Sequence, residues 1–394
     1  MDFEFNDVQR KIAALAEEIA RNFPPEYWRE KDKRGEFAKD FWEELIKANL
    51  TGIMVPEKYG GMGLGITEFA IAAEELAMNG CEMAGYLYLL TEIFIGVPLI
   101  RYGTVEQKER YLPRIVRGEK GCLALTEPHS GSNIFAINTT AIKEGDEWII
   151  NGSKIFITGA DMAKFMIIVA RTPISEHEEM SGKRAGLSLF IAELPNKAIN
   201  ISPIPKYGVG YINVCTVRLN NLRLSNDLLI GTPGQGWHLL LDVLNAERIG
   251  GTASVIGLGK LAISKAVEYS KRRKVFKDPI GSYQSLQFPL AEAYASLECA
   301  RLMNFKASTL WDKKASPSEV GKHVNIAKVV AAEAATKAVF GAMQVFGAYA
   351  YGAGSHFERW MKEVSIFRIA PITQQLALAY IGEHILKMPK SYRA

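Results

Sequence analysis

The segment LALTEPHSGSN, residues 123–133, joins a short apolar run to a Glu-Pro turn and a Ser-Gly-Ser group. Small residues and free backbone N–H groups in such a loop can come close to a planar cofactor or a phosphate. Taken alone, the segment is equally typical of a plain surface loop. It matters because it stands where a long helical region ends and a β-rich region begins.

The β-rich region extends from about residue 119 to residue 231. DEWIINGSKIFITG (146–159) contains two β-type runs around Asn151-Gly152, a dipeptide that favours a hairpin turn. No helical segments alternate with the strands, so the sequence predicts a compact β domain rather than βαβ units. Further strand candidates are KFMIIVART (164–172), GLSLFIAEL (186–194) and NVCTVRLNNLRL (213–224).

Helical periodicity dominates both flanks of this region. In NDVQRKIAALAEEIARNF (6–23), Asn6 is a candidate N-cap, and the apolar residues at helical spacing are Ile12, Leu15, Ile19 and Phe23. Segments such as WHLLLDVLNAERIGG (237–251) show the same pattern after the strands. The sequence therefore predicts an α+β multidomain protein with a helical domain at 1–118, a β domain at 119–231 and a second helical domain at 232–394.

Composition limits the classes of function. The chain has 394 residues, 48% hydrophobic and 23% charged residues and a formal net charge of +4, which favour a globular protein over a nucleic-acid or membrane-surface binder. The four cysteines are widely spaced without a CxxC pair, so neither a disulfide nor a metal site is predicted. An acidic, polar start and the lack of a long uncharged apolar run predict no signal peptide, no membrane span and a cytoplasmic location.

Together, in this order along the chain, these segments resemble the acyl-CoA dehydrogenase family of flavoproteins, and the likeness covers nearly the whole sequence. It implies a helical domain, a middle β-barrel domain and a C-terminal four-helix-bundle-like domain, with bound FAD and a homotetramer or dimer. Four more segments carry the likeness: GTVEQKERYLPRIVRGEK (103–120), RLNNLRLSNDLLIGTPGQGW (218–237), RRKVFKDPIGSYQSLQFPLAE (272–292) and QVFGAYAYG (344–352).

The resemblance also implies positions that contact the cofactor. Leu125, Thr126 and Ser132 would line the flavin or its pyrophosphate. Phe156 would pack against the isoalloxazine ring, and Thr158 would hydrogen-bond near flavin N5. Each also has a plain structural interpretation: Phe156 as a strand core residue, for example, and Thr158 as a β-branched strand residue.

A second group of positions is implied at subunit contacts and near the C-terminus. By the resemblance, Arg273, Phe276 and Gln284 would reach the FAD of a neighbouring subunit, although Arg273 also suits a solvated helix end. The same likeness places Gln344 and Gly347 near the pyrophosphate, and Thr373 and Gln375 among the cofactor contacts that follow the family's base position.

The expected catalytic base is missing from its common place. Many family members carry a Glu close to the C-terminus, and that position falls on Pro371, which cannot accept a proton. Other members place the base on an earlier helix, directly before an Arg, and here Glu247-Arg248 matches that arrangement. The chain therefore resembles the subgroup that lacks the C-terminal Glu.

The local pattern around Glu247 points the same way. Leu240, Val243 and Leu244 lie seven, four and three residues before it, so a helix would place Glu247 on their apolar face. The small residues 250–254 would leave room for a ligand. Loss of hydration would then raise the carboxyl pKa toward that of a working base. The alternative is a Glu that pairs with a cation at a helix surface.

These positions imply FAD-dependent α,β-dehydrogenation of an acyl-CoA, with Glu247 taking the α-proton and flavin N5 the β-hydride. Asn245, Arg248 and Ser132 would lie near the CoA arm and the thioester, and an electron-transferring flavoprotein is the implied acceptor. Two alternatives stay open: a relative that uses FAD without net oxidation, and a flavin- or acyl-CoA-binding protein whose catalysis has decayed.

Overall fold

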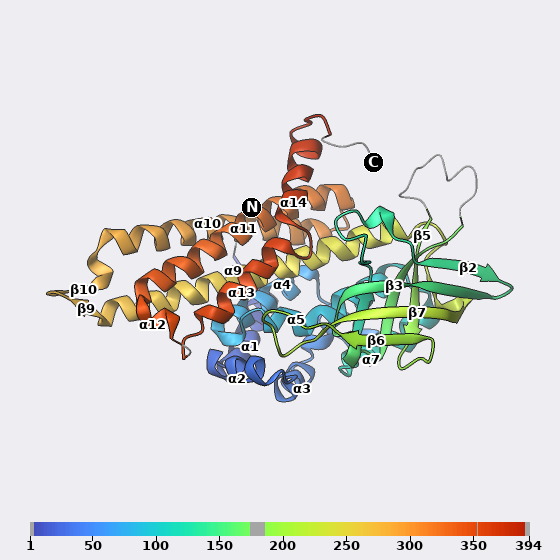
Figure 1. Cartoon of the computed structure of the whole chain (residues 1–394), viewed down its shortest axis with the longest axis horizontal. Helices are drawn as coiled ribbons and strands as arrows, with labels where there is room; N and C mark the ends of the chain where they lie inside the picture. The colour runs from blue at the N-terminus through green and yellow to red at the C-terminus, as the bar shows by residue number, and fades with distance from the viewer. Residues whose placement is uncertain (1–3, 174–185, 353, 391–394) are drawn as a thin grey trace.

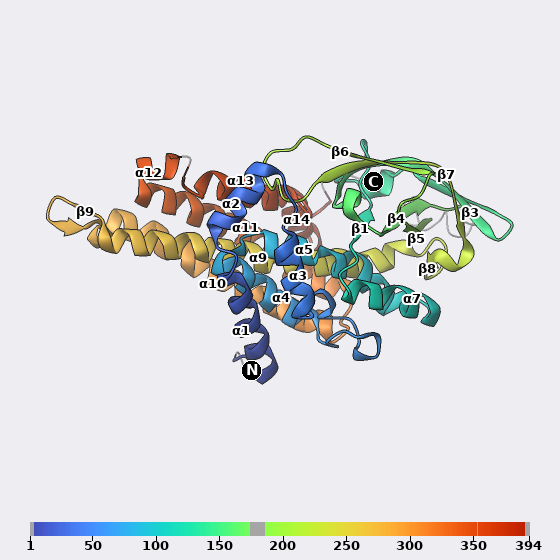
Figure 2. The same cartoon turned by 90° about the horizontal axis from the view of Figure 1, so that it is seen from below.

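The structure is a computed structural model that describes residues 4–173, 186–352 and 354–390. The longest helices run along the longest axis of the molecule, and the β domain lies at one end (Figure 1). The N-terminal helices pack beneath the long helices, as the view from below makes clear (Figure 2). The predicted order of helices, strands and helices is therefore confirmed.

The N-terminal region is helical because its apolar residues recur at helical spacing. Asn6 caps the first helix in a capping box with Gln9. Of the predicted apolar residues, Ile12, Ile19 and Phe23 are buried and Leu15 is partly buried against the same core. The helices of this region are α1 (Asp7–Arg21), α2 (Pro25–Arg34), α3 (Lys39–Lys47), α4 (Ile66–Leu76), α5 (Ala84–Thr91), α6 (Val97–Tyr102) and α7 (Val105–Val116).

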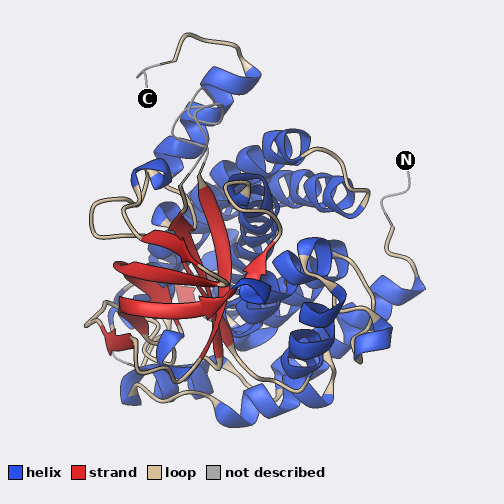
Figure 3. Cartoon of the chain, turned by 90° about the vertical axis from the view of Figure 1, so that its right-hand side faces the viewer, coloured by secondary structure: helices blue, strands red, loops and turns tan. Residues whose placement is uncertain are grey.

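Among the described residues, the middle region forms one eight-stranded mixed sheet in the order β6-β7-β3-β2-β4-β5-β8, with β1 added alongside β4. The predicted barrel thus has the form of a curved sheet whose end strands, β6 and β8, do not pair with each other. Figure 3 shows this sheet beside the helices. The strands are β1 (Gly121–Ala124), β2 (Thr140–Glu144), β3 (Glu147–Thr158), β4 (Phe165–Arg171), β5 (Leu187–Glu193), β6 (Ile199–Pro203), β7 (Val214–Ser225) and β8 (Leu229–Ile230).

The predicted hairpin at Asn151-Gly152 is wrong. Strand β3 runs through both residues, and the turn lies earlier, where Gly145 takes a φ of 61° between β2 and β3. Asn151 instead accepts a hydrogen bond from the Asn221 backbone N–H of β7 at 2.8 Å. Gly152 is needed for close packing, because a Cβ there would lie 2.3 Å from the Thr139 hydroxyl.

The C-terminal region is built on α9, α10 and α11, which pack against one another, with α13 alongside α11. A small hairpin, β9 (Lys274–Val275) with β10 (Asp278–Pro279), joins α9 to α10 at the end of the molecule far from the sheet (Figure 1). The helices are α9 (Gly236–Arg272), α10 (Gln284–Asp312), α11 (Pro317–Phe346), α12 (Ala348–Tyr351), α13 (Phe357–Ile369) and α14 (Gln374–Tyr380).

The two faces of the sheet contribute to different cores. On β4, Phe165, Ile167 and Val169 join the large core shared with the helices, whereas Met166 and Ile168 join a second core inside the β domain. Alternating side chains of one strand therefore bind the sheet to the helices and also fill its concave side. This packing fixes the β domain against α9 and the N-terminal helices.

Among the residues that the structure describes, three helical stretches are long and apolar enough to cross a membrane by length and composition alone. They are Ala84–Tyr102, Pro317–Phe346 and Phe357–Ile385. In the first stretch, 83% of the most apolar 18 residues are buried in the protein interior. In the third stretch, 22% of them are buried. The predicted absence of a membrane span stays a prediction.

Candidate active site

A cavity of about 1060 Å³ lies where the β domain meets the C-terminal helices. Its walls come from the loop after β1, the end of β3, residues 204–214, α9, the start of α11 and the segment from α13 to the C-terminal helix. It brings together nine of the residues predicted from the sequence: Leu125, Thr126, Ser132, Phe156, Thr158, Asn245, Glu247, Arg248 and Thr373.

A buried ion pair holds the loop that follows β1. The Lys154 ammonium, fully buried on β3, donates to Glu127 Oε1 at 2.8 Å and to the Leu125 carbonyl at 3.0 Å. Glu127 also accepts the Thr139 N–H at 2.9 Å and the Thr139 hydroxyl at 2.5 Å. These contacts fix the backbone of the loop, so that Thr126 and Ser132 border the cavity.

Phe156 is exposed to this cavity by an irregularity in β3. The pairing of β3 with β7 shifts register between Lys154 and Ile157, and Phe156 within that bulge has a φ of 60°. Its side chain is 63% exposed, although the strand on either side of it is largely covered. Bulges commonly re-aim a side chain beside a functional site. The interpretation of Phe156 as a strand core residue is therefore wrong.

These features fit a large planar cofactor. The cavity is at the upper end of the usual range for ligand sites. Phe156 offers it an uncovered aromatic ring, and Thr158, on the same strand, lines it with a hydroxyl. Ser132 and Gly131 add a stretch of exposed backbone that can approach a phosphate closely.

Glu247 lies on the α9 wall of the cavity. The side chain is half-buried, and burial raises the pKa of its carboxyl to about 7, against the opposing effect of Arg248. Within the described part of the chain, the carboxylate makes no hydrogen bond or ion pair. The alternative of a Glu paired with a surface cation is therefore not what the structure has, and the carboxylate is free to accept a proton.

The small residues after Glu247 serve a different purpose from the one predicted. None of residues 250–254 lines the cavity. A Cβ at Gly250 would lie 2.7 Å from the rings of Phe69 and Tyr86, so the glycine admits aromatic packing rather than a ligand. The close approach lets the Tyr86 hydroxyl donate to the Glu247 carbonyl at 2.8 Å. Tyr86 thereby anchors the helical turn that carries Glu247.

Arg248 and Asn245 form a polar group beside Glu247. Arg248 Nη1 donates to Asn245 Oδ1 at 2.9 Å, and Asn245 Nδ2 donates to the Pro317 carbonyl at 3.0 Å. Asn245 therefore orients the guanidinium. The Arg248 Nε is buried and has no hydrogen-bond partner among the described residues, which leaves a donor for a ligand.

The C-terminal segment supplies an apolar wall. Pro371 lines the cavity together with Ile369, Ala370 and Ile372. Thr373 caps α14, where its side chain accepts the Leu376 N–H at 3.2 Å. Gln375 is exposed outside the cavity lining.

Five predicted cofactor residues lie far from the cavity within one chain. Phe276 stands at the tip of the β9–β10 hairpin, is 95% exposed and has a φ of 60°. The hairpin and the end of α11 lie at the end of the molecule opposite the β domain (Figure 1). A single chain therefore does not bring Arg273, Phe276, Gln284, Gln344 or Gly347 to its own cavity.

Comparison with known proteins accounts for all three regions. Family models for the N-terminal, middle and C-terminal domains of acyl-CoA dehydrogenases match residues 6–119, 122–222 and 234–386. The acyl-CoA dehydrogenase FadE12 of Mycobacterium tuberculosis is 35% identical over 99% of this chain and 98% of its own. The chain belongs to the acyl-CoA dehydrogenase family.

Solved structures agree with this membership. The butyryl-CoA dehydrogenase of Megasphaera elsdenii superposes with a TM-score of 0.90 at 29% identity, over 98% of this chain and 100% of that one. A structure from work on the electron-transferring flavoprotein of Acidaminococcus fermentans gives 0.91 at 30% identity, with the same coverage. As a family member, this acyl-CoA dehydrogenase is an FAD-dependent oxidoreductase that acts on a CH–CH group.

Sequence reasoning missed several residues that build the site of this acyl-CoA dehydrogenase. Lys154 and Glu127 are charged residues in the interior, where such side chains are rare unless paired. Tyr86 contacts α9 from a distant helix, and no local pattern indicates that contact. Glu92, another buried acidic residue, does not line the cavity: its carboxylate accepts the Met54 and Val55 N–H groups, and burial raises its pKa to about 8.

Proposed function

We propose that this protein oxidises the Cα–Cβ bond of an acyl-CoA thioester to a 2-enoyl thioester, with Glu247 as the base. The observation that carries the proposal is the Glu247 carboxylate, which lines the cavity, lacks a partner among the described residues and has a pKa raised by burial to about 7. A base with a pKa near the working pH is both available and strong enough.

Different residues of this chain bind the cofactor, accept the proton and bind the substrate. Bound FAD supplies the acceptor for the β-hydride. Leu125, Thr126, Phe156 and Thr158 hold and orient it, and Glu247 takes the α-proton. The positive charge of Arg248, oriented by Asn245, helps to hold the anionic substrate near Glu247. Pro371 and its neighbours exclude water from the same space.

We also propose an assembly in which a second copy completes the flavin site. Arg273, Phe276 and Gln284 are exposed at the end of the chain opposite its own cavity. The surrounding surface is rich in exposed apolar side chains, as expected for a subunit contact. The exposed members on the hairpin, the start of α10, the end of α11 and α12 are Val275, Phe276, Tyr283, Phe288, Phe340, Tyr349 and Tyr351.

A homotetramer or dimer of this kind, a cytoplasmic location and an electron-transferring flavoprotein as acceptor complete the proposal. The similarity to a structure from work on an electron-transferring flavoprotein supports that acceptor.

Anaerobic titration of the purified protein with a panel of acyl-CoA thioesters tests the reaction. The proposal predicts loss of the yellow flavin absorbance together with the formation of a 2-enoyl thioester. A yellow protein that binds thioesters yet stays yellow with every member of the panel would favour the non-redox or decayed relative. Product analysis by mass spectrometry separates oxidation from elimination or hydration.

A further inference from the structure

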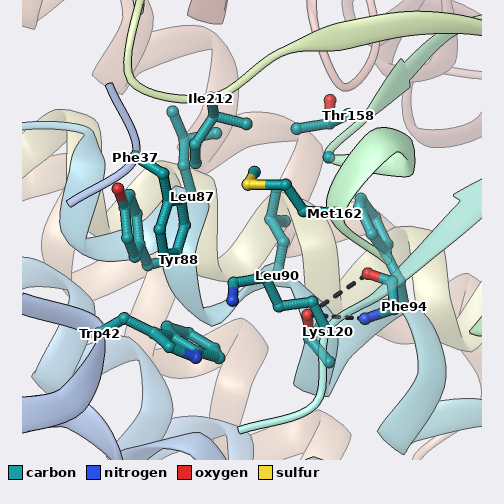
Figure 4. Close-up of a pocket in the computed structure, with 13 residues that line it drawn as sticks. Phe37, Trp42, Leu87, Tyr88, Leu90, Phe94, Lys120, Thr158, Met162 and Ile212 are labelled. Atoms are coloured by element: carbon teal, nitrogen blue, oxygen red, sulfur yellow. Dashed lines mark hydrogen bonds between the residues drawn. The ribbon is translucent and has the colours of Figure 1, made fainter. Parts of the chain in front are cut away.

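A second, much smaller cavity of about 30 Å³ lies beside the main one (Figure 4). We call it the side cavity. Its walls are mostly aromatic and aliphatic, with Phe37, Trp42, Tyr88 and Leu90 on one side and Met162 and Ile212 on another. Into this apolar surrounding projects one long cationic side chain, Lys120, from the residue before β1.

The Lys120 ammonium has aromatic neighbours but no counter-ion. It lies 4.3 Å from the ring centre of Phe37 and 4.7 Å from that of Trp42. In the part of the chain that the structure describes, no carboxylate or hydrogen-bond acceptor contacts it. Burial and the like charge of Lys164 lower the pKa of Lys120 to about 8, so the amine is mainly charged at pH 7. A cation in such a place is incompletely satisfied.

The side cavity adjoins the space beside the proposed base. Leu87, Phe94, Thr158 and Ile212 line both cavities, so only side chains separate them. Leu87 and Phe94 lie on one face of the helical stretch that begins with α5, and Leu90 on that face lines the side cavity. Tyr86, next to Leu87, bonds to the Glu247 carbonyl. An acyl chain that leaves its α-carbon at Glu247 along this face is therefore directed toward Lys120.

Two other polar side chains around the side cavity already have partners. The Thr91 hydroxyl donates to the Gly121 carbonyl at 3.3 Å and accepts the Gly121 N–H at 3.2 Å. The Tyr88 hydroxyl accepts the Ala38 N–H at 2.6 Å. Lys120 is the charged group in this lining, and its three donors with a positive charge favour a carboxylate over a methyl group.

We propose that the side cavity is a subsite for a carboxylate at the far end of the acyl chain, so that the preferred substrates are half-thioesters of dicarboxylic acids. The proposal rests on the proposed function of the main cavity, since it names the substrate class of that site. The volume of the side cavity is about two probe spheres, on the scale of one or two waters or a single carboxylate. The carboxylate of the substrate would be the counter-ion that Lys120 lacks among the described residues.

Matched pairs of thioesters test this subsite. Each pair has one chain length and differs only at the end, with pentanoyl- and glutaryl-CoA, hexanoyl- and adipyl-CoA, and octanoyl- and suberyl-CoA as examples. Calorimetric dissociation constants are measured on FAD-loaded protein carrying Glu247→Gln, so that turnover does not contribute heat. At the chain length that fits, the carboxylate member is expected to bind about 10- to 100-fold more tightly than its neutral partner.

Two lysine variants locate the preference. Lys120→Met keeps the length and the apolar stem but removes the charge, and it should abolish the preference. Lys164→Met removes a nearby charge that is exposed outside the side cavity, and it should keep the preference. The comparison of the neutral and carboxylate thioesters in the protein without a lysine change does not depend on the folding of either lysine variant.

The outcomes separate the two proposals. Equal or tighter binding of the neutral member at every length overturns the subsite, as does a preference that survives Lys120→Met. Carboxylate members that bind tightly but never bleach the flavin of the parent leave the subsite standing and refute the dehydrogenase proposal. Failure of both series to bind overturns both.

Discussion

Replacing Glu247 with Gln is the sharpest test of the active site. The amide fills the same volume and leaves the hydrogen bond from Tyr86 intact, because that bond goes to the backbone carbonyl. It cannot accept the α-proton. General-base catalysis contributes about 10²–10⁴-fold, so the rate of flavin reduction by substrate should fall by that factor, while FAD content and thioester affinity change little.

The pH dependence of the parent provides a second signature. With a pKa of about 7, roughly a tenth of the Glu247 carboxyls are ionised at pH 6 and about nine-tenths at pH 8. Flavin reduction should therefore rise about tenfold between these pH values and then level off. The rise follows from loss of the proton, because only the carboxylate accepts another. In Glu247→Gln the residual rate should lack this step.

Folding stability gives an independent check, because the contribution of Glu247 to stability falls with rising pH whereas the rate of flavin reduction rises. Burial raises the Glu247 pKa in the folded state, so this group favours folding when protonated, and its contribution is lost as pH rises through about 7. The Gln variant lacks that loss and should melt no lower than the parent at pH 8. If Glu247→Gln melts at a lower temperature than the parent at pH 8, the substitution has disturbed the packing around residue 247.

Rapid mixing under anaerobic conditions measures the bleaching rate. Glu383→Gln is the comparison variant, because Glu383 is another carboxylate that lines the cavity. If Glu247→Gln bleaches as fast as the parent and Glu383→Gln does not, the base has been assigned to the wrong helix. If neither variant slows bleaching, the argument that burial prepares Glu247 to act as the base fails.

Three further predictions concern the cofactor, the assembly and the loop that follows β1. The protein should purify yellow or turn yellow with added FAD; a protein that stays colourless contradicts the fit of the cavity, and absorbance spectra decide. Arg273→Ala should weaken both FAD retention and the oligomer, since a ligand bound by the assembled state stabilises that state; light scattering that finds a monomer fully loaded with FAD would contradict this. Lys154→Met leaves the Glu127 carboxylate buried without its counter-ion and should cost about 3–5 kcal/mol in the free energy of unfolding, whereas exposed Lys143→Met should cost little; denaturant titration compares them.

Local sequence patterns predicted which faces of the helices are buried. The helical repeat around Ile12 and the apolar face before Glu247 both appear as expected, because periodicity reports which side of an element is buried. Asn151-Gly152 misled because its turn preference is local, while its position is decided by contacts with Asn221 and Thr139 on other strands. The contact of Tyr86 with α9 joins residues 161 positions apart, which no window of sequence contains.

In the proposed mechanism Glu247 is the base, although the family resemblance implies a Glu at the position of Pro371. A carboxylate at residue 371 would share one cavity with Glu247, and two like charges in a poorly solvated space raise the pKa of one of them. With Pro371 and its aliphatic neighbours there instead, Glu247 has no competing charge from this segment, and the wall they form removes water. Loss of hydration then raises the pKa to about 7 against the pull of Arg248. The apolar segment and the carboxylate on α9 are therefore two parts of one cavity, in which burial raises the pKa of Glu247 and the hydrogen bond from Tyr86 anchors the helical turn that carries it.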